Sequence, residues 1–447
     1  MRKNLILFAL AMIMFLFACK KDEETSPFDV GYTDETPEQS KAKVEQNAID
    51  LVDQMDNLSS ATAIEVLMHL NKLQSGTPVK SAKADPFLET ISLVGSLGDK
   101  NNTSRVFDGM KLTGDLLADD PLSFSALFDS LAGKYTYNFG TGEFDKSELD
   151  DQIIFEFPGK ESDETNTALI TVDNFTVAEI TDPIEQWPSE LAPELPASIT
   201  IDLQYNGISV AGAEFSAAYK SDGMPTQVNV EIYVDDFTLT VKVVHSPYSS
   251  ASWTNTLKFQ SDILFETYIA AEGNWSPDNL DNNITEVTYE DEYGTWTETN
   301  VDIEEIINNA NAHVILMNLQ VIGQVNLKVL GDAIEALKEQ QELLTEEEFV
   351  QALVDAINEN ARLIVIYRDS NTKIAEAEAY VESSFDDYTQ ETNYYPSMRF
   401  VYADGSKVDV ETYVNSELDN FYTSVNNFID KLNAEYDLEL NYIGPQE

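Results

Sequence analysis

The spacing of apolar residues changes twice along the chain, and the first pattern is helical. Thr36-Pro37-Glu38-Gln39 combines an N-cap residue, a proline at the first helical position and a glutamine three residues after the cap. Apolar residues then recur at three-to-four spacing, which places them on one helical face: Val44, Ala48, Leu51, Met55 and Leu58. A second helix is predicted over residues 61–74, and short helices over 86–97 and 121–132. Residues 36–133 are therefore expected to form a helical N-terminal region.

From residue 134 to residue 300 the apolar period switches to two, which is typical of strands with one buried face. Ile199, Ile201 and Leu203 alternate with polar residues, and Asn206-Gly207 then predicts a hairpin turn. Turns are also expected at Asp222-Gly223 and Asp235-Asp236. Turns between neighbouring strands imply antiparallel pairing, so this region is predicted to be a meander of long strands.

Residues 301–447 are expected to be helix-rich with a small β-hairpin. An apolar stripe at helical spacing predicts one long helix over residues 302–341, containing Ile303, Ile307, Ala310, Val314, Met317 and Val321. This helix is expected to cover the meander, either with a fully packed core between them or with a ligand hollow near Gly323. Further helices are predicted at 345–360 and 418–432, and strands at 363–367, 374–381 and 399–402. The predicted fold class is α+β, with a long-stranded antiparallel β-meander packed against helices.

The first 18 residues have the features of a secretory signal. Arg2 and Lys3 precede an apolar stretch that runs to Ala18, and this stretch is shorter than the ~20 residues that span a bilayer. Cys19, the only cysteine of the chain, follows directly. This arrangement resembles the lipobox of bacterial lipoproteins. The resemblance implies cleavage before Cys19, acylation of that residue, and attachment to outer-membrane lipid.

The residues after Cys19 add a second resemblance. Lys21, Asp22 and Glu23 place a lysine and two acids close behind the expected lipid. This tract is similar to the surface-export signal of Bacteroidota lipoproteins, which implies a protein that faces the cell exterior. Residues 19–35 are interpreted as an acidic tether between lipid and body.

Charge narrows the possible partners. The 447 residues include 80 acids against 26 lysines and arginines, which gives a net charge of −54. Such a surface repels nucleic acid and anionic lipid headgroups, so a nucleic-acid partner is not expected. Cations and neutral ligands remain compatible with it, and the acidity also suits a saline habitat, where salt screens self-repulsion. After acylation of Cys19 no thiol remains for a disulfide or for thiolate chemistry.

Few residues suggest a binding site. Tryptophans in or near predicted loops are candidates for stacking on sugar rings, although packing at the rim of the core is an alternative for them: Trp187, Trp253, Trp275 and Trp296. Asp278 and Asp281 belong to an oxygen-rich run that suits calcium, the one cofactor considered. The three histidines fall in no paired-ligand motif, and no catalytic residue stands out.

The sequence therefore favours a non-enzymatic, lipid-anchored surface protein that binds or displays a ligand. A glycan, an apolar molecule or another surface protein are the partners considered. The alternative is a surface glycoside hydrolase that uses paired carboxylates about 5–9 Å apart.

Overall fold

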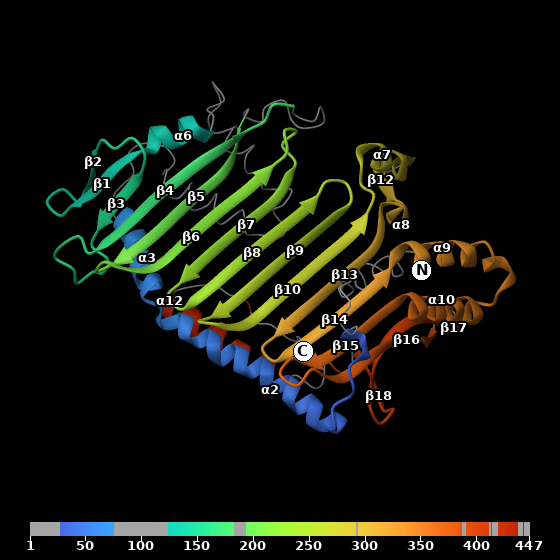
Figure 1. Ribbon diagram of the computed structural model, residues 1–447. Helices are drawn as coiled ribbons and strands as arrows, with labels where there is room; N and C mark the ends of the chain where they lie inside the picture. The colour runs from blue at the N-terminus through green and yellow to red at the C-terminus, as the bar shows by residue number, and fades with distance from the viewer. Residues whose placement is uncertain are drawn as a thin grey trace. The chain divides into compact units, whose positions relative to one another are not determined.

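The computed structural model describes residues 27–75, 124–182, 194–291, 294–386, 390–410 and 419–436, together with residues 413 and 441. The helix predicted at 86–97 lies outside these residues. Within them, the chain forms an α+β fold built on one large, mostly antiparallel sheet with a few helices, as the sequence predicted (Figure 1).

Sixteen strands make up this sheet, in the order β18-β17-β16-β15-β14-β13-β10-β9-β8-β7-β6-β5-β4-β3-β1-β2. Strands β1 and β3 pair in parallel, whereas the pairs from β3 to β8 and from β13 to β18 are antiparallel. A separate two-stranded ribbon is formed by β11 (Ile284–Asp291) and β12 (Gly294–Val301).

The strands of the large sheet are β1 (Gly133–Asn138), β2 (Glu143–Ser147), β3 (Ile153–Phe157), β4 (Ala168–Glu179), β5 (Glu194–Tyr205), β6 (Ile208–Tyr219), β7 (Pro225–Val234), β8 (Phe237–Ser246), β9 (Ser250–Phe259), β10 (Asp262–Gly273), β13 (Ile307–Leu316), β14 (Leu319–Asn326), β15 (Ala361–Tyr367), β16 (Thr372–Asp386), β17 (Glu391–Tyr402) and β18 (Lys407–Asp409). The described helices are η1 (Pro27–Asp29), α2 (Pro37–Met55), η2 (Asp56–Ser60), α3 (Thr62–Ser75), α6 (Phe124–Leu131), α7 (Pro277–Asn283), α8 (Ile303–Ile306), α9 (Leu327–Lys338), η4 (Gln341–Leu343), α10 (Glu346–Asn360) and α12 (Asp419–Tyr436).

The chain divides into two compact units, of which one comprises residues 55–245 and 255–262 and the other residues 1–54, 246–254 and 263–447. In the first unit, α3 packs on one face of the meander through Ala63, Val66 and Leu70. Its partners are core residues of β3 to β6, such as Ile170 and Leu203, which lie opposite each other in the sheet.

In the second unit, helices cover one face of β14 to β17. Val44 of α2 packs against Val365, and Leu330 of α9 packs against Leu363, so both helices lie on the side to which alternate residues of β15 point. Helix α10 lies beside α9 and contacts β16 through Ala379. Helix α12 lies against α2, where the amide of Asn420 donates to the Glu45 carboxylate over 3.0 Å.

The predicted helix over residues 302–341 is wrong. Strands β13 and β14 occupy most of this range, and only α8 and the later α9 are helical. These strands have apolar residues on both faces of the sheet. Some of these residues are by coincidence three or four positions apart, and that spacing imitates the stripe of a helix. Val314 and Val321 are cross-strand neighbours, and the turn between them is made by Met317 with φ of +54° and Asn318. A Met-Asn turn lacks the glycine by which a hairpin turn is recognised in a sequence, so the hairpin was not predicted.

The ligand hollow was predicted beside that helix, so its prediction is wrong for the same reason. Gly323 lies in β14, directly between Ala312 of β13 and Leu363 of β15. The meander predicted to end at residue 300 is also only part of the sheet, which continues to Asp409.

Several local predictions are confirmed. Helix α2 begins with a capping box, in which the Gln39 amide donates to Thr36 Oγ1 over 3.3 Å and the Thr36 amide donates to Gln39 Oε1 over 2.9 Å. Asn206 and Gly207 form the β5–β6 turn, with φ values of +53° and +77°. The small β-hairpin predicted in residues 301–447 is formed by β17 and β18, whose turn lies at Ala403-Asp404-Gly405-Ser406. These signals lie within three or four residues, so they act before tertiary contacts do.

Candidate functional site

Residues 27–35, which we call the strap, are the first residues of the chain that the structure describes. They pack on the sheet of the second unit. Phe28 is only 2% exposed and lies against Ile322, Ile364 and Ile366. The guanidinium of Arg362 stacks on the Phe28 ring at 4.7 Å from its centroid. The sequence placed these residues in the tether, whereas Phe28 fills a position in the core.

The middle of the strap adds backbone pairing. Tyr32 forms a parallel bridge with Lys373, whose amide donates to the Gly31 carbonyl over 2.8 Å. The Thr33 amide donates in turn to the Lys373 carbonyl, also over 2.8 Å. The buried Lys373 ammonium lies 4.8 Å from the Tyr32 ring centroid and pairs with Glu376. Burial, with a smaller effect of the Glu376 charge, raises the pKa of the Tyr32 phenol, which therefore stays neutral.

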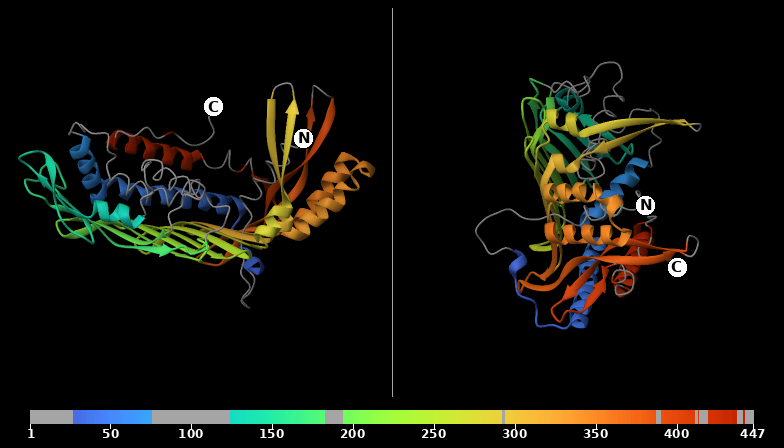
Figure 2. Two further views of the ribbon diagram at one scale, coloured as in Figure 1. Left: turned by 90° about the horizontal axis from the view of Figure 1, so that it is seen from above. Right: turned by 90° about the vertical axis from the view of Figure 1, so that its right-hand side faces the viewer.

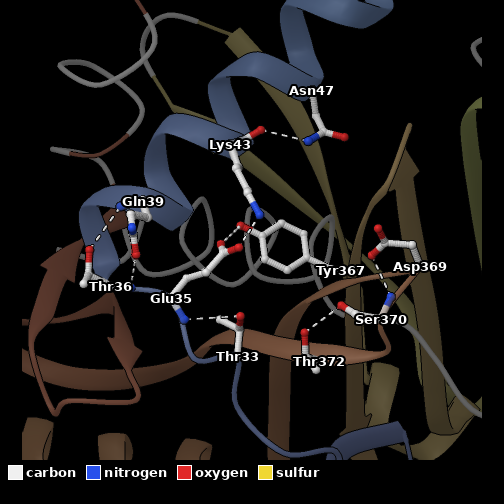
Figure 3. Close-up of polar contacts among 10 residues, drawn as sticks. All are labelled: Thr33, Glu35, Thr36, Gln39, Lys43, Asn47, Tyr367, Asp369, Ser370 and Thr372. Carbon is white, nitrogen blue, oxygen red and sulfur yellow. Dashed lines mark hydrogen bonds and ion pairs between the residues drawn. The ribbon is translucent and has the colours of Figure 1, made fainter.

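The strap ends in a polar cluster at the start of α2 (Figure 3). Glu35 pairs with Lys43 of α2 and accepts a hydrogen bond of 2.9 Å from the Tyr367 hydroxyl at the end of β15. The Lys43 hydrogen bond is the main reason that the pKa of Glu35 is lowered, and the Tyr367 hydroxyl contributes in the same direction. Burial raises the pKa of Tyr367, so its hydroxyl remains a donor at any ordinary pH. These three groups connect strap, helix and sheet.

The same helix is fixed to two turns of the sheet. Asn47 accepts from the Asn318 amide over 3.1 Å, and Asn318 Oδ1 accepts from the Asp369 amide over 2.9 Å. Asp369 accepts in turn from the Ser370 amide over 2.6 Å (Figure 3). A separate side-chain hydrogen bond between Asn318 and the Asp369 carboxylate lowers the pKa of Asp369, which helps to keep this carboxylate ionised. These hydrogen bonds and burial favour ionised carboxylates at Glu35 and Asp369 and a neutral phenol at Tyr367.

Five carboxyl groups among the described residues have a clearly shifted pKa. A general acid needs a raised pKa, yet the carboxyl groups with a resolved shift in this part of the chain are all shifted downward: Glu35, Glu348, Asp369, Glu378 and Asp404. At Glu378, burial alone would raise the pKa, but hydrogen bonds from Lys407 and Arg399 outweigh it. The paired-carboxylate alternative gains no support from the described groups.

The calcium candidates lie on α7. Asp278 is exposed in the first turn of this helix, and Asp281 follows in it. Neighbouring amide side chains bond to backbone carbonyls, as when Asn279 Nδ2 donates to Asn274 over 2.6 Å and to Glu305 over 2.9 Å. Among the residues that the model describes, no group of three or more histidine, cysteine or acidic side chains is arranged to hold a metal.

Only two of the predicted tryptophans have described side chains. Trp253 lies in β9 and Trp275 follows β10, and both are half-buried. Trp296 pairs with Tyr289 in the β11–β12 ribbon, but its side chain is not described. Trp187 lies outside the described residues, as do Cys19, Lys21, Asp22 and Glu23.

Sequence reasoning missed an array of other aromatic rings in the first unit. The Tyr135 and Phe155 rings stack at 4.7 Å, and Phe144 meets Phe155 edge-on at 5.9 Å. Tyr137 contacts Phe144 at 5.5 Å and Phe139 at 5.3 Å. We call these five rings, on β1 to β3 and the β1–β2 turn, the aromatic array. The available signal was the alternation of Tyr135, Tyr137 and Phe139 along β1 and its turn.

The array is bordered by polar groups. Phe139 at its end is 51% exposed, whereas the other four rings are half-buried. The Lys146 ammonium lies 5.1 Å from the Tyr135 ring centroid at the other end. Asn138 Nδ2 donates to Asp145 over 2.8 Å beside the turn, and Asn166 Nδ2 donates to the Tyr137 carbonyl over 3.1 Å. Rings next to amides and a carboxylate can contact a ligand that is apolar on one face and hydroxylated at its rim.

No helix within the described ranges is both long and apolar enough to cross a membrane. No protein-family model matches this chain, and no curated protein or solved structure is significantly similar to it.

Proposed function

We propose that this protein is a lipid-anchored protein of the outer cell surface that binds or displays a ligand without transforming it. The observation that carries the proposal is the strap. Phe28 enters the core only nine residues after Cys19, the residue expected to carry the lipid. A lipid at Cys19 would therefore hold the folded unit directly, because the strap, the polar cluster and α2 form a continuous set of contacts.

Anchoring is tested by supplying cells with a radioactive fatty acid. The natural protein should become labelled and sediment with outer membranes, whereas Cys19→Ala should remain unlabelled and either be released or accumulate as precursor. An unlabelled mature natural protein would refute the anchor. Surface exposure is tested separately by replacing Lys21, Asp22 and Glu23 with alanine. This variant should keep its lipid but resist protease added to intact cells; its continued degradation would refute the export role of the tract.

Among the ligand classes, a neutral glycan is favoured by the aromatic array. Sugar rings present C–H faces that pack on aromatic rings and hydroxyls that bond to amides and carboxylates at the rim. The net charge of −54 disfavours anionic ligands, whereas a neutral glycan meets no such repulsion.

The chain offers a matched pair of variants to test this ligand class. Phe139 in the array is 51% exposed, and Phe385 near the end of β16 is 57% exposed in a different unit. A native gel containing a neutral polysaccharide should retard the natural protein and Phe385→Ala, while Phe139→Ala should lose at least about half of the retardation, since stacking of one ring contributes ~1 kcal/mol or more. Equal retardation of the two variants, or no retardation of the natural protein by any neutral polysaccharide in a broad panel, would exclude the array as a glycan site.

A further inference from the structure

The first part of the strap, with Phe28 and Val30, lies on the face of the second unit's sheet opposite to its helices. Residues alternate along β15, so Ile364 and Ile366 point to the strap while Leu363 and Val365 point to the helices. Figure 2 shows this separation, with η1 on one side of the sheet and α2, α9 and α10 on the other. We call these two sides the strap face and the helix face.

The chain between lipid and strap is short. Only residues 20–26 separate Cys19 from η1, and nine residue steps separate Cys19 from Phe28. A fully extended chain covers ~3.3–3.6 Å per residue, which limits the distance between the Cys19 and Phe28 Cα atoms to about 30 Å.

This length is insufficient to attach the unit by its helix face. Helix α2 covers the sheet there and α12 lies on α2. With helix diameters of ~10–12 Å and interaxial distances of 8–10 Å, the outer surface of α12 lies about 25 Å from the sheet. The chain from Phe28 must first clear the end of the seven-residue β15, which adds roughly 10 Å at ~3.3 Å per residue. The required path exceeds the reach of the nine residues.

The pairing of several carboxylates on the strap face makes it compatible with a lipid surface. Three carboxylates of this face each have a cationic or ionisable partner: Glu376 pairs with Lys373, Glu378 with Arg399 and Lys407, and Glu266 with His313 over 2.9 Å. Paired acids repel anionic headgroups less than free ones do. Exposed Gln324 lies on this face beside Arg362, so the surface is polar and suited to headgroups, not to the hydrocarbon layer.

We infer that the strap face of this unit is turned toward the bilayer and that its helix face, with the α9–α10 pair, is turned toward the medium. The inference rests on the proposed lipid at Cys19 and adds the orientation of the anchored unit. The partner of the strap face is the headgroup surface of the membrane that holds the lipid.

Two single-cysteine variants test the orientation, because acylated Cys19 leaves no other thiol in the chain. Gln324→Cys places a fluorophore on the strap face. Leu343→Cys places one at the α9–α10 connection on the helix face, where Leu343 is 84% exposed. Each labelled full-length lipoprotein is reconstituted into vesicles that contain an acceptor-labelled lipid, and energy transfer is measured.

Transfer should be more efficient from position 324 than from position 343. Adding Phe28→Ala to both variants should reduce this difference, because release of the strap lengthens the connection between Cys19 and the packed part of the unit from residues 20–26 to residues 20–36, and α2 begins at Pro37. Equal or greater transfer from position 343 in attached protein would overturn the inference. Failure of the lipoprotein to attach to vesicles at all would instead refute the lipid anchor, and with it the basis of the orientation.

Discussion

Replacing Phe28 with alanine should release the strap while leaving the rest of the fold intact. Phe28 is 2% exposed, contacts three isoleucines and stacks under Arg362. Truncating a buried phenylalanine costs ~3–5 kcal/mol, and loss of the cation–π contact is included in that range at ~0.5–1 kcal/mol. The lower end applies here, because a segment at the surface can rearrange over the vacated space. A loss of about 3 kcal/mol corresponds to a roughly hundredfold shift of the strap equilibrium toward release.

Two amides report this equilibrium directly. The Thr33 amide bonds to the Lys373 carbonyl and the Lys373 amide bonds to the Gly31 carbonyl, so both hydrogen bonds exist only while the strap is docked. Their hydrogen exchange should become about a hundredfold faster in Phe28→Ala if exchange follows local opening. The Arg368 amide, which bonds to the Asn318 carbonyl between the turns that follow β15 and precede β14, is the internal control and should be unchanged.

The control variant is Phe385→Ala, in which the lost ring is 57% exposed and no strap contact is removed. Unchanged exchange at Thr33 and Lys373 in Phe28→Ala would refute the role of Phe28 in holding the strap. Equal acceleration at Arg368 would show instead that the strap unfolds only together with the sheet, so that it is no separate element.

The remaining predictions concern pH and one close approach. Because the Lys43 and Tyr367 hydrogen bonds lower the pKa of Glu35 below its ordinary value of 4.5, their stabilisation should be complete above that pH and should be lost as the pH falls through the lowered pKa. Exchange at Thr33 should therefore accelerate relative to Arg368 in acid, and Glu35→Gln should abolish this pH dependence; a Glu35→Gln profile identical to the natural one would exclude Glu35 as the titrating group. Gly212→Ala should lower the free energy of unfolding by ~1–3 kcal/mol in a denaturant titration, because the new Cβ would lie 2.5 Å from the Ile201 carbonyl and 2.6 Å from the Tyr233 ring. Gly31→Ala, whose Cβ would meet nothing within 4 Å, is the matched control, and equal losses in the two variants would contradict the close approach.

Local sequence signals determined many of the elements. The structure contains the capping box at Thr36, the helix predicted at 345–360, the turns at Asn206-Gly207 and Asp235, and the alternating strands between these turns. Each depends on residues a few positions apart, whose steric and hydrogen-bonding preferences operate without the rest of the chain.

Tertiary structure decided what those signals could not. The residues of β13 and β14 have apolar positions compatible with both a helix and two strands, and the strand form prevails because β10 and β15 pair with them on either side. Phe28 packs with Ile364, although the two residues lie 336 positions apart in the sequence. The sequence of residues 27–35, which was interpreted as part of an acidic tether, did not indicate this contact. The alternation of Phe28, Val30 and Tyr32 was the only local sign of pairing. An apolar side chain stabilises the fold only when a partner surface covers it. The sequence of one segment does not specify which distant segment supplies that surface.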